Sequence, residues 1–320
     1  MKRKLYAISG GSDVRRLLAR LEVHLTAAIR GQDAALVRMA SVLRRGALGL
    51  SSPHRPKGSF LLLGPTGVGK TESTIVFTRY LMGEGRLFRF DMSECQTQES
   101  LGLLLGSNAH ERGLLGQCVT GADHGTLLFD EIEKAHPRLM DVFLQILDAG
   151  RVTFADGFTA DLSGFYVVFT SNIASGELLD WQHSSFATME RHVLTRAQQW
   201  LRPELYARIT EKLVFQRLGY DVQVEIAGLM LARHLAMLEE KGHRLVAVPE
   251  VLPLLIREGF HPRLGARPLR DAIERLVGDA VVASLLAHGS ANGFLLVDQH
   301  GSLAVGETAK LPAREAADQA

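Results

Sequence analysis

A short glycine-rich segment contains the residue types best suited to binding phosphate. Residues 64–71 read GPTGVGKT, and an apolar run over residues 60–63 precedes them. The apolar run predicts a buried strand, and the eight residues match the phosphate-binding loop pattern without a mismatch. In this pattern the glycines let successive backbone N–H groups face one anion, and the following helix adds its positive N-terminal end. A glycine-rich strand-to-helix turn without a ligand is the alternative interpretation.

The residues of this loop have expected roles in binding a nucleoside triphosphate together with Mg²⁺. The Lys70 amine can reach the β and γ phosphates, which gives it a catalytic as well as a binding role, and the Thr71 hydroxyl can ligate Mg²⁺. We expect ATP to contact the whole loop, which consists of Gly64, Pro65, Thr66, Gly67, Val68, Gly69, Lys70 and Thr71.

Two further strand ends carry polar residues that suit hydrolysis. The predicted buried strand TLLFDE ends in Asp130 and Glu131. Asp130 is placed to hold Mg²⁺, and Glu131 can polarise the attacking water. The strand FYVVFTSN ends in Asn172, whose amide can orient the same water. A solvated acidic pair and a polar strand-end turn are the alternatives for each segment taken alone. Together the three segments predict in-line attack of water on the γ phosphate of ATP.

These residues require a parallel α/β sheet, because ligands of such sheets bind at the carboxyl ends of the strands. A chain of 320 residues suffices for two domains of about 100–200 residues each. Its hydrophobic fraction of 46% is typical of globular domains, and a net charge of +1 indicates no acidic partner. Two cysteines exclude a disulfide framework. No apolar run reaches the roughly 20 residues of a membrane span or resembles a signal peptide, so we expect a cytoplasmic protein without a membrane partner.

Six strings along the chain are more specific than the phosphate loop alone. In chain order they are GPTGVGKTE, FDMSE (90–94), LLFDEIEKAHP (127–137), LQILDAGRVT (144–153), FTSN (169–172) and GARPLRDAIE (265–274). They resemble the AAA+ module of the Clp unfoldases, specifically the second ATPase module of ClpA and ClpB, from about Leu21 to Val305. The resemblance implies a P-loop (AAA+) parallel sheet with flanking helices, followed by a smaller, mainly helical α+β C-terminal domain.

The resemblance also implies how the chain is divided. The expected parts are an N-terminal extension (1–20), a large AAA+ ATPase domain (21–217), a small C-terminal domain (218–305) and a flexible tail (306–320). In the small domain, Leu231, Leu235 and Leu238 fall on one face of a predicted helix, and Gly242 is a plausible stop. These leucines are therefore expected in the core of the small domain.

Several residues take roles that the resemblance alone implies. Ile29 and Arg30 fall where the family contacts the adenine base, and Asn172 falls on its first sensor position. Arg208 corresponds to the arginine finger, which reaches the γ phosphate bound by a neighbouring subunit. Arg267, in the GARP string, corresponds to the second sensor. These roles imply an ATP-promoted ring of identical subunits, a homohexamer as in the family.

One segment departs from the family. No aromatic residue occurs between Phe90 and Phe129, where Clp unfoldases carry an aromatic–hydrophobic–glycine motif that grips polypeptide. The shorter loop LLGSNAHERG leaves three interpretations open. It is a trimmed surface turn, or it recognises a specific partner through its polar residues, or the leucines beside it grip apolar chains. The residues concerned are His110, Glu111 and Arg112 for the second interpretation and Leu114 and Leu115 for the third.

A second family loop corresponds to ADGFTAD, residues 155–161, where Phe158 replaces an arginine. Phe158 is either an alternative pore aromatic or a turn aromatic folded back on the core. The segment after Asn172 lacks the tripeptide with which Clp unfoldases dock a peptidase, so a ClpP-like partner is not indicated.

The leading functional hypothesis is an ATP-driven protein that remodels or disassembles one specific protein client. The alternative is a nucleic-acid-associated AAA+ regulator or loader, suggested by basic residues near the N-terminus, although the pI of about 7.9 lies below the usual range for such proteins. A nucleotide-switched assembly factor that hydrolyses slowly is a third hypothesis.

Overall fold

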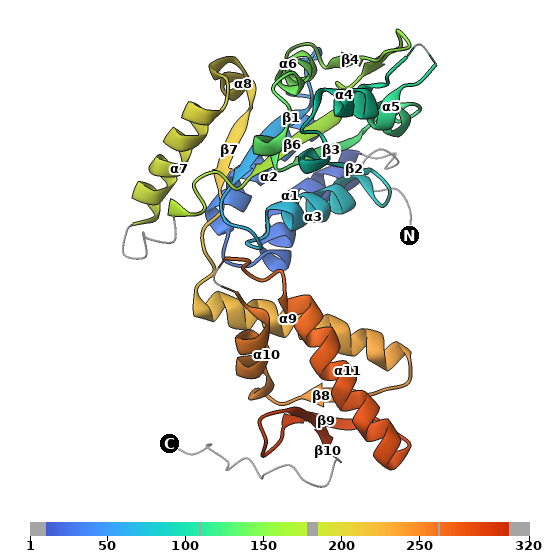
Figure 1. Ribbon diagram of the computed structural model, residues 1–320, viewed down its shortest axis with the longest axis vertical. Helices are drawn as coiled ribbons and strands as arrows, with labels where there is room; N and C mark the ends of the chain where they lie inside the picture. Colours follow the sequence, from blue (N-terminus) through green and yellow to red (C-terminus); the bar gives the residue numbers. More distant parts are fainter. Residues whose placement is uncertain (1–10, 109, 178–184, 262, 307–320) are drawn as a thin grey trace. The chain divides into compact units, whose positions relative to one another are not determined.

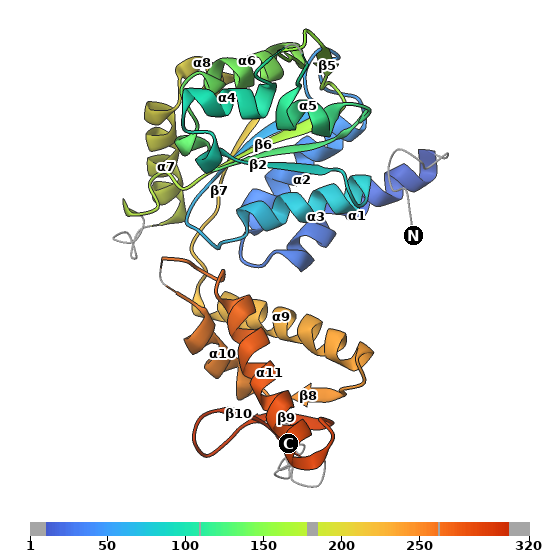
Figure 2. The same ribbon diagram turned by 45° about the vertical axis from the view of Figure 1, so that its right-hand side comes forward.

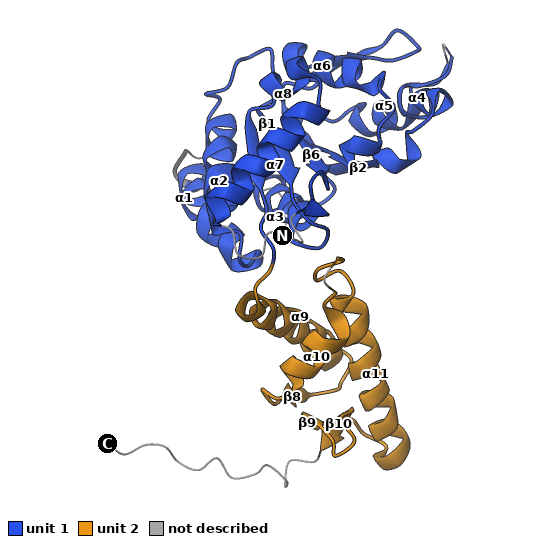
Figure 3. Cartoon of the chain, turned by 60° about the vertical axis from the view of Figure 1, so that its left-hand side comes forward, with its two compact units in different colours: residues 1–217 blue, residues 218–320 orange. Residues whose placement is uncertain are grey.

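We describe the protein from a computed structural model, in which residues 11–108, 110–177, 185–261 and 263–306 are described. The chain splits into two compact units, Met1–Arg217 and Leu218–Ala320, each with a hydrophobic core of its own (Figure 3). The tail expected at 306–320 lies outside the described residues, except for Gly306.

The first unit is built on a parallel sheet with strand order β2-β3-β6-β1-β7 (Figure 1). Its strands are β1 (Gly58–Leu63), β2 (Leu87–Asp91), β3 (Gly125–Asp130), β6 (Phe165–Ser171) and β7 (Glu211–Val214). Every residue of β1, β3 and β6 is buried, because these near-continuous apolar runs are covered on both faces by helices. The parallel sheet expected from the sequence is confirmed.

Helices cover both sides of this sheet (Figures 1 and 2). One side carries α1 (Gly11–Ala28), α2 (Asp33–Ala47) and α3 (Lys70–Met82), and the other carries α4 (Gln98–Leu105), α5 (Gly113–Val119) and α6 (Leu139–Ala149). The remaining elements are the short helices η1 (Met92–Glu94) and η2 (Ile132–Lys134), the hairpin strands β4 (Arg151–Thr153) and β5 (Thr159–Asp161), and helices α7 (Phe186–Trp200) and α8 (Pro203–Arg208). Helix α7 packs against the edge strand β7, and α8 packs against α6.

An aromatic cluster fixes the carboxyl ends of three neighbouring strands. The Phe129 ring on β3 lies 5.4 Å from Phe90 on β2, 5.5 Å from Phe169 on β6 and 4.7 Å from Phe143 on α6, measured between ring centroids. Such pairs stabilise beyond the area that they bury, and they hold the strands at one level. The polar residues that follow these strands therefore start from fixed positions.

The first helix spans the boundary expected between the N-terminal extension and the large domain. Helix α1 starts at Gly11 and continues across the boundary expected between residues 20 and 21. Leu18, Leu21 and Leu25 are buried, and the Tyr80 hydroxyl on α3 donates to the Leu17 carbonyl oxygen at 3.0 Å. Residues on both sides of position 20 therefore pack against the sheet domain.

The second unit consists of three helices around a small sheet, counting only the described residues. The helices are α9 (Tyr220–Glu240), α10 (Val251–Gly259) and α11 (Leu269–His288), and the strands are β8 (Leu245–Ala247), β9 (Gly293–Val297) and β10 (Leu303–Gly306). Strands β8 and β9 are parallel, and β9 and β10 are antiparallel. Leu231 and Leu238 are buried, and α9 ends two residues before Gly242. The smaller, mainly helical α+β unit is therefore confirmed.

Candidate active site

The phosphate loop occupies the turn between β1 and α3, in a conformation that requires glycine. Gly64 has a φ of +135°, and a Cβ atom at this position would lie 2.4 Å from the carbonyl oxygen of Phe215. No side chain fits at that distance, so only glycine lets the loop pass this close to the neighbouring backbone. Helix α3 then starts at Lys70, which directs its unpaired N–H groups toward the loop. The loop and the N-terminal N–H groups of α3 together therefore form a site suited to a phosphate group.

The Lys70 side chain lies folded over this loop. Its Nζ donates to the carbonyl oxygen of Gly64, to that of Pro65 at 2.7 Å and to Asn172 Oδ1 at 2.9 Å. Burial lowers the pKa of the Lys70 amine to about 8, although the nearby carboxylates of Glu133, Asp130 and Glu131 act in the opposite direction. The amine is therefore a buried cation that a phosphate group would stabilise more than the neutral oxygens that it now contacts.

Asp130 and Thr71 face each other across the start of the loop. The Thr71 hydroxyl lies 3.5 Å from Asp130 Oδ2, while Asp130 Oδ1 accepts a hydrogen bond from the Thr170 hydroxyl. Arg89 also donates to Asp130 Oδ2, at 2.6 Å. One carboxylate and one hydroxyl are the kind of donor set that Mg²⁺ takes from a protein, the rest coming from water and phosphate oxygens. The residues present therefore fit Mg²⁺ bound to a nucleotide.

Glu131 is held in a backbone conformation that is rare for residues other than glycine. Its φ is +57°, and its N–H donates to Thr170 Oγ1 at 3.0 Å. Its carboxylate accepts from Asn172 Nδ2 at 3.1 Å and pairs with Lys134 at 2.5 Å. Such strain persists only where surrounding contacts fix it, and it is concentrated at functional sites. The contacts here aim the Glu131 carboxylate toward the phosphate loop.

Asn172 joins the two halves of the site. Its side-chain oxygen accepts from Lys70, its side-chain nitrogen donates to Glu131, and its backbone N–H donates to Glu133 Oε1 at 2.9 Å. The residues expected at three separate strand ends therefore lie in one hydrogen-bonded group. A water molecule held by Glu131 and Asn172 would stand close to a phosphate held by Lys70.

The residues expected at the base lie beside the loop. Ile29 is buried in the turn after α1, and a Cβ atom on Gly69 would lie 3.1 Å from its Cγ2 atom. Arg30 follows it in the same turn and is half-buried. Gln32, two residues after Arg30, makes a contact that was not expected from the sequence. Its Nε2 atom donates to the Val68 carbonyl oxygen at 3.2 Å. The segment expected to contact adenine and the phosphate loop are therefore linked by a hydrogen bond.

The two remaining arginines belong to different units of the chain. Arg208, the last residue of α8, pairs with Asp148 on α6, and Asp148 also lies 3.5 Å from Arg55. Arg267 belongs to the second unit, where it is exposed in the turn before α11. Pro268 is the N-cap residue of α11, so Arg267 stands just outside the helix.

The loop without aromatic residues is tied to the β4–β5 hairpin. Arg112 Nε donates to Asp156 Oδ2 at 2.5 Å, and the Arg112 guanidinium lies 4.1 Å from the centroid of the Phe158 ring. Arg112 is therefore occupied by contacts within the molecule, which argues against its part in the second interpretation of the loop, recognition of a partner. Phe158 also stacks against the buried Phe154, although 37% of its surface remains exposed.

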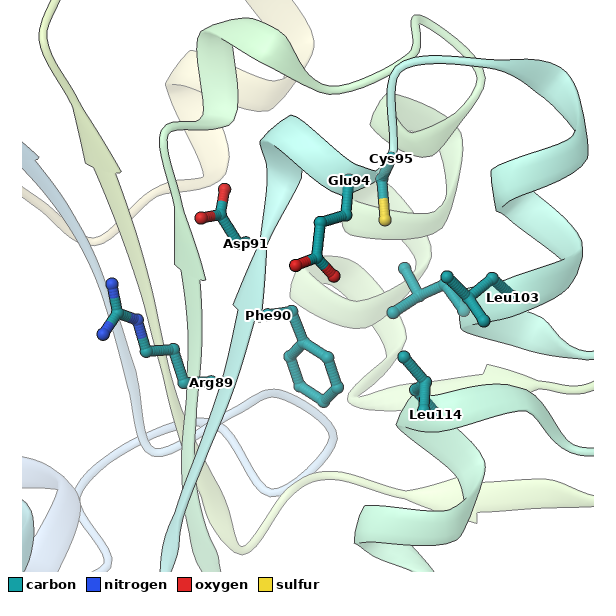
Figure 4. A pocket seen from close by; sticks show the side chains of 8 residues that line it. Arg89, Phe90, Asp91, Glu94, Cys95, Leu103 and Leu114 are labelled. Atoms are coloured by element: carbon teal, nitrogen blue, oxygen red, sulfur yellow. The ribbon is translucent and has the colours of Figure 1, made fainter.

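Of the two leucines named in the third interpretation of the loop, only one is exposed. Leu115 is fully buried in the core, whereas Leu114 is 40% exposed. Leu114 lines a cavity of about 180 Å³ together with Leu103, Phe90 and Cys95 (Figure 4). The third interpretation of the loop therefore stays open for Leu114 only.

These features define a P-loop protein of the AAA+ class: a nucleotide-type cradle, an acidic pair and an amide at neighbouring strand ends, and a smaller second unit. Residues 55–212 match the family described as "AAA domain (Cdc48 subfamily)", and residues 218–294 match "C-terminal, D2-small domain, of ClpB protein". The chain belongs to the Clp family of AAA+ ATPases and resembles the second module of its members.

Individual relatives agree with this family. The chain is 37% identical over 288 residues to the "ATP-dependent Clp protease ATP-binding subunit ClpA homolog" of Porphyra purpurea. It is also 37% identical over 277 residues to chaperone protein ClpB of Vibrio cholerae. Both matches cover 84% of this chain, but 35% and 32% of the relatives, so the chain spans about a third of their length.

The fold is also shared with a solved structure, a closed-state cryo-EM reconstruction of Hsp104 with ATPyS and FITC casein. The TM-score is 0.83 at 28% identity, and the match covers 93% of this chain and 53% of the Hsp104 chain. None of the helices in the described ranges is long and apolar enough to cross a membrane.

Proposed function

We propose that this chain hydrolyses ATP and uses the reaction to remodel or disassemble a specific protein client. The observation that carries the proposal is the contact chain Lys70–Asn172–Glu131, which joins the phosphate-binding amine to the carboxylate beside it. A structural turn would need neither a buried lysine nor a strained glutamate at this place.

In the proposed reaction, the backbone N–H groups of the loop and the Lys70 amine bind the phosphates of ATP. The Glu131 carboxylate accepts a proton from water, while Asn172 Nδ2 orients that water for in-line attack on the γ phosphorus. The bond from the γ phosphorus to the bridging oxygen breaks, which releases ADP and phosphate. When bound by Thr71 and Asp130, Mg²⁺ neutralises negative charge on the phosphate oxygens.

The proposed active unit is a ring of identical subunits, a homohexamer as in the family. Arg208 acts as the finger toward the nucleotide of a neighbouring subunit, and Arg267 acts as the second sensor from the small domain. Residues 21–217 and 218–305 serve as the large and small domains of the module, and Ile29 and Arg30 flank the adenine base. Arg208 lies at the end of α8 with 37% of its side chain exposed, which supports its action outside its own subunit.

The proposed client is a particular protein rather than any unfolded chain. The relative solved as Hsp104 contains FITC casein, which supports a polypeptide client for this chain as well. The absence of aromatic residues between Phe90 and Phe129 supports narrow specificity, since an aromatic side chain is the usual means of pressing on arbitrary sequences. The segment for docking a ClpP-like peptidase falls partly at 178–184, outside the described residues.

The test of ATP hydrolysis is the substitution Glu131→Gln. We expect ATP turnover to fall by at least about 100-fold, because the general base is lost, while binding of a fluorescent ATP analogue is retained. Glu84→Gln is the matched control, because Glu84 is an exposed carboxylate of the same unit. Turnover by Glu131→Gln at the level of Glu84→Gln would refute the proposed mechanism.

The same variant tests the client, because it should hold ATP and remain bound to its partner. Glu131→Gln is used with ATP to capture partners from nuclease-treated and untreated lysate, and each captured protein is then added in pure form to the wild-type chain. A protein retained after nuclease treatment that also stimulates ATP turnover is the expected result. Recovery of nucleic acid alone, lost after nuclease treatment, would favour the nucleic-acid-associated alternative instead.

A further inference from the structure

An arginine that the sequence did not single out contacts the carboxylate assigned to Mg²⁺. Arg89 lies on β2, the edge strand of the sheet, and its Nη2 atom lies 2.6 Å from Asp130 Oδ2. Its side chain extends to the side of β2 opposite to Phe90 and Leu114 (Figure 4). Arg89 also belongs to the lining of the cavity beside Leu114, but the contact of its guanidinium is with Asp130, on the nucleotide side of the strand.

The geometry of Asp130 shows which of its two oxygens Arg89 occupies. Asp130 Oδ1 accepts the hydroxyl of Thr170 from the neighbouring strand β6. Asp130 Oδ2 is the oxygen that lies 3.5 Å from the Thr71 hydroxyl, the second expected Mg²⁺ ligand. Arg89 is thus bound to the oxygen on the metal-facing side of the carboxylate.

We propose that Arg89 is a competing cation, which pairs with Asp130 before metal binding and must release Oδ2 for Mg²⁺ to bind. Arg89 thereby lowers the affinity of the site for the metal, and Mg²⁺ can bind only when the Arg89 side chain moves away from Asp130. This inference rests on the proposed ATPase function, and it adds to that function a residue that determines metal affinity.

Burial explains why the carboxylate needs a partner and why the arginine can leave. The Asp130 side chain is 10% exposed, so an unpaired negative charge there would be strongly unfavourable. The Arg89 side chain is 49% exposed, so its guanidinium can return to water at little cost. A guanidinium and a divalent cation bound to the same oxygen would repel each other. Arg89 and Mg²⁺ therefore cannot both bind tightly to Asp130 Oδ2 at the same time.

The test measures metal binding rather than turnover. Mn²⁺ is titrated into the full chain at a fixed ADP concentration, and bound metal is read from its electron paramagnetic resonance signal. Arg89→Gln and Arg89→Met should each lower the half-saturating Mn²⁺ concentration about two- to fivefold, the range that one partly exposed ion pair supplies. Arg89→Lys should restore a value close to that of the wild type, because it keeps the charge.

Arg79→Gln is the matched control, since it removes an arginine of the same unit that pairs with Glu84 at 2.7 Å on the surface. It should leave the half-saturating Mn²⁺ concentration unchanged. Unchanged or raised values for both Arg89→Gln and Arg89→Met would overturn the inference, a raised value meaning that Arg89 orients Asp130 for the metal. A wild-type chain that binds neither ADP nor Mn²⁺ would instead overturn the proposed function.

Discussion

Lys70 has an ionisation state that should control nucleotide binding. Its pKa is lowered to about 8 by burial, and bound phosphates would favour the charged amine and raise that pKa again. Between the two pKa values, binding of a nucleotide must therefore take up a proton. The affinity contributed by this group is constant below pH 8 and decreases as the pH rises above 8.

We expect the affinity for ATP to fall by up to about tenfold per pH unit above pH 8. Binding of a fluorescent ATP analogue between pH 7 and pH 9.5 measures this decrease. Lys70→Arg is the control, because a guanidinium keeps its proton throughout this range. The same decrease in Lys70→Arg would assign the effect to another group.

At the residue scale, the sequence predicted the groups that follow a local pattern. The phosphate loop and Asn172 come directly after apolar strands and Asp130 ends one, so their meeting at the carboxyl ends of the strands followed from the parallel arrangement. The contacts of Thr170 and Gln32 did not follow, because they depend on how side chains meet in three dimensions. Gln32, for example, accepts a hydrogen bond from the backbone N–H of Gln216, which is distant in the sequence.

At the scale of elements, α6 and α8 are joined by two ion pairs of different expected importance. Asp148 binds Arg208, the proposed finger, and Asp141 binds Arg202 at 2.6 Å just before α8. Both pairs link the same two elements. Only the first holds a residue with a proposed role in the reaction.

We therefore expect Asp148→Asn to lower ATP turnover of the assembled protein by about fivefold, the effect of one partly exposed ion pair on the orientation of Arg208. Asp141→Asn is the matched control and should stay close to the wild type. Turnover is measured at saturating ATP, together with thermal unfolding of both variants. An equal loss in both variants would mean that the pairs only stabilise the packing of α8 on α6.

Tertiary packing also narrows the interpretations of the loop that the sequence left open. Arg112 was a candidate for recognising a partner and Leu115 a candidate for gripping apolar chains, but neither the ion pair of Arg112 with Asp156 nor the burial of Leu115 is visible in a local pattern. The family resemblance starts near Leu21, whereas helix α1 starts at Gly11 and buries Leu18 as well as Leu21.

At the scale of the whole molecule, the order of a parallel α/β unit and a smaller helical unit could be predicted, since each has its own pattern of apolar residues and its own family strings. Assembly into a ring could not be predicted in the same way, because a subunit interface leaves no comparable local pattern in the sequence. The proposed ring depends on a residue that is useful only to a neighbour: within the described part of the chain, Arg208 contacts Asp148 and the Glu204 carbonyl oxygen rather than the phosphate loop.

Complementation between two inactive variants tests this assembly. Arg208→Ala keeps Glu131 but supplies no finger, and Glu131→Gln keeps the finger but cannot activate water, so each alone should turn over little ATP. In a random equal mixture, about a quarter of the subunit contacts place an intact Glu131 beside an intact Arg208, so turnover should recover to about a quarter of the wild type. The control mixes Arg208→Ala with a chain carrying both substitutions, which supplies no finger and should restore nothing. If the first mixture is no more active than the sum of its components, each site works within a single subunit and the ring is not required for hydrolysis.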